Sequence, residues 1–167
     1  MIFKGPLVLA ISALLATTVS VRAADCTQPS GPGVDWQRCY LDGRDLQGQD
    51  LSHSHLVDGS FERSNLSQVN LSGANAYHAK FISARLTKAK LDDGNFAEAD
   101  FTKAELDGAS LRNADLRRAK FFHASIKGAD LSGAKTLGAD MLNADLSGAT
   151  WTDGKRVCAE GSVGQCN

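Results

Sequence analysis

Three groups of side chains in this sequence have the chemistry to form a site. His53 and His55, two residues apart in "SHSHL", have side chains that can ligate a metal ion. Four cationic side chains gather in "LRNADLRRAK" and could hold a phosphate or an anionic polymer: Arg112, Arg117, Arg118 and Lys120. Four cysteines, suited to disulfides or to redox chemistry, lie towards the two ends of the chain: Cys26, Cys39, Cys158 and Cys166. The elements that position these groups decide what they can do.

The elements follow a period of five residues. In "ADLRRAKFFHASIKGADLSGAK", a small residue is followed two positions later by a bulky one, and the pair recurs every five residues. An α-helix would spread these bulky residues around its whole surface, and a continuous strand would throw them alternately to opposite faces. The chain must therefore turn once in every repeat. Between turns, a short strand points the small and the bulky residue to the same inner face.

The same register extends over most of the chain and contains a second, slower period. The bulky position runs from Leu41 to Trp151, with only Ala76 and Thr136 weak in it. Most of the in-register phenylalanines are twenty residues apart: Phe61, Phe81, Phe101 and Phe121. Four five-residue sides therefore close one coil, and like side chains stack on like. The pattern predicts a square, all-β solenoid of about five to six coils.

The repeat resembles a known family. The runs "ADLSGA" and "ADMLNADLSGATW" resemble the A(D/N)LXX signature of the pentapeptide-repeat proteins, and the resemblance covers residues 39–151. It implies a right-handed quadrilateral β-helix. Some members of the family mimic DNA and bind a type II topoisomerase, which makes this an alternative function. Such mimicry requires a stripe of carboxylates and a cytoplasmic address, and the sequence favours neither.

The first 23 residues have the features of a secretory signal peptide. "MIFKGPLVLAISALLATTVSVRAAD" combines an early lysine, an apolar run and small residues that suit cleavage before Ala24. A retained signal anchor is the alternative, although the apolar run is shorter than the ~20 residues of a spanning helix. Lipidation is disfavoured because Asp25 precedes Cys26. We expect a periplasmic or extracellular protein with no membrane span after cleavage.

The sequence then divides into two caps and a solenoid. Residues 24–40 form the predicted N-terminal cap, residues 41–151 the β-helix and residues 152–167 the C-terminal cap. An even number of cysteines in an exported chain predicts disulfides. The two ends are ~26 Å apart at about 4.8 Å per coil, whereas a disulfide requires Cα atoms within about 7 Å. The distance leaves only Cys26 with Cys39 and Cys158 with Cys166, as structural staples.

The predicted walls give little support for catalysis or for cofactor binding. Flat walls of solvated side chains do not converge on a concave site, so we predict no enzyme activity, no cofactor and no metal site. His53 and His55 straddle a corner, and His78 and His123 stand alone. The four clustered cations lie within a coil of several carboxylates, namely Asp92, Asp93, Glu98, Asp100 and Asp115. A mixed, solvated wall that does not bind nucleic acid is therefore expected.

One wall carries apolar residues on its outer side. The residue after each inner one in the phenylalanine column changes from acidic to apolar along the chain: Asp42, Glu62, Ile82, Thr102, Phe122 and Leu142. Tyr77 and Leu137 extend this apolar surface on the adjoining side. The alternatives are ordinary scattered surface hydrophobes or cover by the C-terminal tail. The sequence thus predicts an exported, non-catalytic scaffold whose walls contact a protein partner or a second copy, with topoisomerase mimicry and enzyme activity as alternatives.

Overall fold

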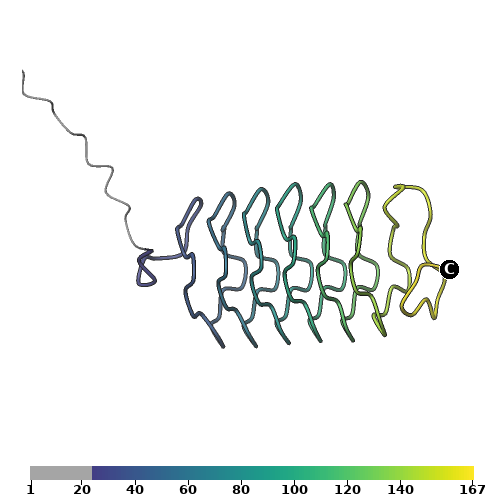
Figure 1. Ribbon diagram of the computed structural model, residues 1–167, viewed down its shortest axis with the longest axis horizontal. Coiled ribbons are helices and arrows are strands. Elements are labelled where there is room, and N and C mark those ends of the chain that lie inside the picture. Colours follow the sequence, from purple (N-terminus) through teal and green to yellow (C-terminus); the bar gives the residue numbers. More distant parts are fainter. Residues whose placement is uncertain (1–23) are drawn as a thin grey trace, which may run out of the picture.

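The molecule is a stack of four-sided coils along one axis. The computed structural model describes residues 24–167, and the predicted signal peptide lies outside the described residues. In Figure 1 the coils follow one another along the long axis, and the C-terminus lies at one end. Residues twenty apart form parallel bridges, from Asp35 with His55 to Asp130 with Thr150. Each coil therefore contains twenty residues.

The regular elements are single-residue bridges separated by turns. Within residues 24–167 there is no helix, hence none that could cross a membrane, and no strand longer than one residue. The short strand predicted between turns is reduced to one bridging residue. The physical reason is that a four-residue β-turn occupies the other four positions of every pentad.

Each pentad has five positions with separate roles, and residues 99–103 illustrate them. Ala99, at the small position, and Phe101, at the central position, point inward and are fully buried. Asp100, at the bridge position, pairs with the coils on both sides. Thr102, at the outward position, and Lys103, at the corner position, face solvent.

Every corner requires an unusual backbone conformation. The amide of Ala104 donates to the carbonyl of Phe101 at 2.9 Å and so closes the turn. The corner residue has a positive φ in every pentad from Gly33 to Gly148, and fifteen of these residues are not glycine. Their φ values lie between 55° and 59°. This region costs an L-residue about 1–2 kcal/mol, so the contacts between stacked coils must offset the strain.

The bridge position explains the preference for aspartate or asparagine. Four amides of a pentad donate to backbone carbonyls, either across the turn or in a neighbouring coil. The fifth amide, at the outward position, donates to the side chain of the bridge residue, as from Thr102 to Asp100 Oδ1 at 2.9 Å. Twelve pentads of the described chain contain this bond. An Asp or Asn side chain therefore satisfies the only backbone donor that the stacking leaves over.

Where serine occupies the bridge position, an aspartate in the preceding coil accepts the amide of the outward residue instead. Asp92 Oδ1 accepts both the hydroxyl of Ser110 and the amide of Arg112, the latter at 2.9 Å. The same arrangement recurs at two further sites, formed by Asp42 with Ser60 and Glu62, and by Asp107 with Ser125 and Lys127. The outward amide thus keeps a carboxylate acceptor although its own pentad lacks one.

The core consists of inner columns of stacked side chains. The rings of Phe61, Phe81, Phe101 and Phe121 lie nearly parallel, with centroids 5.0–5.2 Å apart. Trp36 is only 3% exposed and fills a central position in the first coil. Bridges accordingly begin at Asp35, within the segment assigned from sequence to the N-terminal cap.

Both ends carry a disulfide, but among residues 24–167 only the C-terminal end has its backbone edge covered. Cys26 is joined to Cys39 and Cys158 to Cys166, with Cα atoms 5.5 Å and 4.8 Å apart. The C-terminal segment runs antiparallel to the last coil and bridges Thr150 with Val157 and Asp145 with Val163. At the other end, the first coil leaves the side chain of Tyr40 83% exposed.

Candidate interaction surface

The predicted contact face lies on one side of the β-helix, which we call the phenylalanine wall. Its central positions are Phe61, Phe81, Phe101 and Phe121. Because the turn bends at the outward and corner positions, the wall runs from a corner residue such as Glu98 to the next outward residue, Thr102. Three columns of side chains therefore face solvent on this wall, and neighbours within a column belong to successive coils.

The three columns differ in character. The corner column contains His78, Glu98, Arg118 and Gly138. The bridge column contains Lys80, Asp100, Lys120 and Asp140. The outward column contains Ile82, Thr102, Phe122 and Leu142. Two columns are thus largely charged, and the third is mostly apolar.

The outward column places the predicted apolar residues together, with one interruption. Ile82 and Phe122 are half-buried, and Leu142 is 59% exposed. Phe122 and Leu142 occupy adjacent coils, whereas Thr102 separates Phe122 from Ile82. The C-terminal segment bridges residues of the other walls, Asp145 and Thr150, and leaves Leu142 accessible.

Tyr77 and Leu137 lie across the corner, on the preceding wall. They are 39% and 80% exposed and stand at opposite ends of a hollow of about 390 Å³. Ala97 and Gly138 create the hollow because they contribute almost no side chain. Hydrogen bonding to Glu98 raises the pKa of the Tyr77 hydroxyl. This hollow is continuous with the corner column, because Glu98 and Arg118 also line it.

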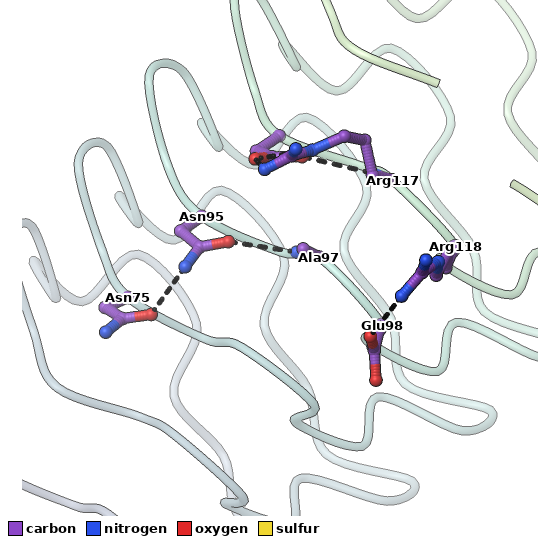
Figure 2. A network of polar contacts seen from close by, with 7 residues as sticks. Asn75, Asn95, Ala97, Glu98, Arg117 and Arg118 are labelled. Atoms are coloured by element: carbon purple, nitrogen blue, oxygen red, sulfur yellow. Dashed lines mark hydrogen bonds and ion pairs between the residues drawn. The ribbon is translucent and has the colours of Figure 1, made fainter. Parts of the chain in front are cut away.

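Each cation of the basic cluster has a carboxylate partner. Arg118 Nη1 lies 3.3 Å from Glu98 Oε1 in the neighbouring coil, as Figure 2 shows. Arg117 Nη2 lies 2.6 Å from Asp115 Oδ2, and this pairing lowers the pKa of Asp115 and raises that of Arg117. The other two pairs are Arg112 with Asp130 at 3.7 Å and Lys120 with Asp100 at 3.9 Å. The phenylalanine wall, which contains Arg118 and Lys120, is therefore electrostatically mixed. The four cations lie on three different walls and do not form an isolated phosphate site.

The histidines occupy unrelated positions. His53 is a corner residue, and His55 is a bridge residue in the next pentad. Within residues 24–167, no three His, Cys, Asp or Glu side chains gather closely enough to hold a metal ion. His78 Nδ1 lies 2.8 Å from Asp58, and His123 packs beside the ring of its neighbour in sequence.

Sequence analysis missed the alternating charges of the bridge column. Lys80, Asp100, Lys120 and Asp140 are twenty residues apart, so their pattern emerges only when the chain is read once per coil. Figure 2 illustrates the contact between coils at the bridge position: Asn95 bonds both to the amide of Ala97 and to Asn75 in the preceding coil. Side chains at this position therefore stack directly on one another.

Twenty-residue coils, inward-facing small and central residues and side-chain-capped turns define a β-helical solenoid. A family model described as a pentapeptide repeat region matches residues 34–111, and one described as pentapeptide repeats, in eight copies, matches residues 99–135 and 124–150. The chain belongs to the pentapeptide-repeat proteins, whose fold is a right-handed β-helix. No similar protein was found among curated sequences.

Solved structures of the same family resemble the chain. HetL, a pentapeptide repeat protein involved in heterocyst differentiation regulation from the cyanobacterium Nostoc sp. strain PCC 7120, is 31% identical with a TM-score of 0.72. The match covers 74% of this chain and 58% of HetL, so the chain spans little more than half of that protein. A pentapeptide repeat protein of the Arabidopsis thaliana thylakoid lumen is 27% identical, with 74% and 83% of the two chains covered and a TM-score of 0.36. QnrB1, a plasmid-mediated fluoroquinolone resistance protein, is 18% identical, with 72% and 79% covered and a TM-score of 0.41.

Proposed function

We propose that the protein is an exported, non-catalytic scaffold that binds a protein partner through the phenylalanine wall. The observation that carries this proposal is the apolar outward column, with Ile82, Phe122 and Leu142 accessible beside two charged columns. An apolar strip flanked by charged side chains has the make-up of a protein interface with a polar rim. A wall whose charges alternate does not offer the continuous carboxylate stripe that DNA mimicry needs.

Export and the absence of catalysis are parts of the same proposal. Two disulfides within short loops suit an oxidising compartment, and they would staple the ends of a thin solenoid of about five to six coils. The hollows of the walls are open and lined by ion-paired side chains such as Glu98 and Arg118. Pentapeptide-repeat proteins are in general structural proteins, in keeping with a scaffold.

The test combines fractionation with a wall variant. Mature protein should be recovered from the periplasm or the medium, starting at Ala24 with both disulfides formed. The double variant Phe122→Asp with Leu142→Lys changes no inner position, so its melting temperature should stay near that of the parent while capture of a partner from periplasmic extract falls. The matched control, Ser67→Lys with Thr87→Asp, alters the same outward position on the following wall.

Two results would overturn the proposal. Unfolding of the double variant would mean that the column is buried structure. A stable variant that captures its partner as well as the control does would show that binding uses another surface.

A further inference from the structure

We propose that the partner of the phenylalanine wall is a second copy of the protein, docked antiparallel on the same wall. The inference rests on the proposed function, because it identifies what that wall contacts. It derives from one property of the wall. When a second copy is turned end over end, each column faces the same column in the opposite order, and opposite charges or apolar residues then lie against each other. An isologous two-fold interface requires such self-complementarity.

The bridge column gives the first part of the match. Consider a two-fold axis that lies in the interface, perpendicular to the solenoid axis, midway between the levels of Asp100 and Lys120. Each column then faces the same column of the second copy in reverse order. Asp100 faces Lys120, and Lys80 faces Asp140. The two-fold repeats both pairs, so four pairs of opposite charges form.

The other two columns match in the same register. In the corner column, Glu98 faces Arg118 of the second copy. In the outward column, Ile82 faces Leu142 and Thr102 faces Phe122. One placement therefore pairs opposite charges in two columns and brings together the apolar residues of the third.

Competing placements are electrostatically worse. A parallel two-fold dimer sets Lys80 against Lys80 and Asp100 against Asp100 at every level. An antiparallel dimer displaced by one coil also fails, because Asp100 then faces Asp100 or Lys120 faces Lys120. Like charges in direct opposition cost free energy, so the alternation excludes the parallel dimer and the one-coil displacement. A displacement by two coils again sets opposite charges face to face, but it forms two such pairs instead of four.

The cations needed for this contact are accessible, whereas the side chains of Asp100 and Glu98 are 22% and 36% exposed. The side chains of Lys120 and Arg118 are 61% and 77% exposed although each has an intrachain partner. Lys80 and Asp140 form no ion pair with any described residue, and the second copy would supply one for each. On the following wall the outward column is polar throughout, with Ser67, Thr87, Asp107 and Lys127. The apolar and the charged complementarity thus coincide on the phenylalanine wall.

The size of the surface predicts a weak dimer. Four coils span about 20 Å, and three columns two residues apart span about 15 Å, which gives roughly 300 Å² per copy and roughly 600 Å² in total. Stable interfaces bury about 1,200–2,000 Å². We therefore expect association that depends on protein concentration and weakens as salt screens the exposed charges.

A charge-exchange experiment tests the dimer. Glu98→Arg sets a cation against Arg118 of the second copy, and Arg118→Glu sets a carboxylate against Glu98, so each variant alone should sediment as a monomer where the parent dimerises. In a one-to-one mixture the exchanged charges complement each other, and the heterodimer should form at least as readily as the parental dimer. Corner side chains suit this purpose because neither Glu98 nor Arg118 accepts a backbone amide.

The control uses an ion pair between adjacent coils on the following wall, at the bridge position. Arg85 Nε lies 3.1 Å from Glu105, again twenty residues apart, and both side chains are 57% exposed. Arg85→Glu and Glu105→Arg should leave the sedimentation of the mature protein unchanged. Circular dichroism of every variant verifies the fold.

The outcomes separate this inference from the proposed function. A parent that stays monomeric at all concentrations, or single variants that dimerise like the parent, would overturn the antiparallel dimer. Failure of the mixture to dimerise would overturn it as well. If the parent is monomeric and the Phe122→Asp, Leu142→Lys variant still loses capture of an extract protein, the scaffold function stands and its partner is a different protein.

Discussion

Two adjacent columns of the phenylalanine wall obey opposite rules. The inner column repeats one residue type, and its rings stack within 9° of parallel. The outward column, one residue further along the same backbone, contains Glu62, Ile82, Thr102 and Phe122 in successive coils. Inside, each ring stacks on a ring of the same type in the next coil, and Phe96 of the preceding wall lies beside Phe81 and Phe101. Outside, each side chain faces solvent. The fold therefore depends on the small, central, bridge and corner positions. The outward position determines what the wall binds, except where an outward aspartate such as Asp92 accepts a backbone amide of the next coil.

The strongest test of this contrast is a pair of substitutions one residue apart. Phe101→Ala removes a fully buried ring between Phe81 and Phe121 and should cost about 3–5 kcal/mol of unfolding free energy through the cavity it leaves. Thr102→Ala should cost no more than about 0.5 kcal/mol. Urea unfolding measures both. Similar losses for the two variants would contradict the division into inner and outward columns.

The core and the ends could be predicted from sequence because their constraints repeat or are purely geometric. Residues such as Phe101 and Leu106 recur with a period that only an inward-facing position explains, and both are fully buried. The spacing of the coils restricts the cysteine pairs by distance alone, and the structure joins Cys26 to Cys39 and Cys158 to Cys166. No tertiary information beyond the coil length was needed.

The corners and the charged column could not be predicted in the same way. A positive φ is usually inferred from glycine, yet residues as different as Lys103 and Glu98 adopt it. Asp92 serves an amide twenty residues away, so its role depends on the register of stacking. The alternation of Asp100 and Lys120 likewise has meaning only once coils lie above one another. What sequence reasoning missed was contact between coils rather than structure within a pentad.

A second prediction tests whether the positive φ of a solvent-facing corner position limits which residues are tolerated there. Gly128 has a φ of +61°, and a Cβ there would meet no atom within 4 Å. Gly128→Ala should therefore lose about 1 kcal/mol from backbone strain alone. Gly128→Asn, whose side chain tolerates this conformation better, should lose less. Thermal unfolding compares the two, and equal stability of alanine, asparagine and glycine variants would mean that the corner imposes no such constraint.

A third prediction concerns the aspartate that accepts an outward amide of the next coil when the bridge residue there is serine. Asp92→Ala leaves the amide of Arg112 and the hydroxyl of Ser110 without their shared acceptor and should cost about 1 kcal/mol. Adding Ser110→Asp places a carboxylate in the usual bridge position and should restore most of the loss. Ser110→Asp in the parent should itself be destabilising, because it replaces the hydroxyl that donates to Asp92 with a second carboxylate. Equal losses for Asp92→Ala with and without Ser110→Asp would contradict the claim that a bridge carboxylate can replace Asp92 as the acceptor of the Arg112 amide.

The smallest expected effect is on acid stability, and it also separates the two faces of the chain. Hydrogen bonds from Ser132 and Ser147 lower the pKa of Asp130 and of Asp145 in the folded protein. A carboxyl group with a lowered pKa stabilises the folded state fully above its unfolded value of about 3.9 and loses this contribution as the pH falls through the folded value. The melting temperature should thus not respond to these groups between about pH 5 and 8 and should fall below about pH 4. In the variant Asp130→Asn with Asp145→Asn, amide oxygens still accept the backbone amides of Ser132 and Ser147 but do not titrate. The acid decline should therefore be shallower, and the variant should be slightly less stable than the parent at neutral pH, where the lowered pKa values stabilise the parent. Melting curves from about pH 2 to 7 compare this variant and the parent with the double variant Asn65→Asp, Asn70→Asp. Its new carboxylates replace side-chain amides that donate to Asp45 and Asp50, so protonation relieves a repulsion and acid should destabilise this protein less than the parent. Identical acid limbs in all three proteins would show that the bridge carboxylates contribute through their shape alone.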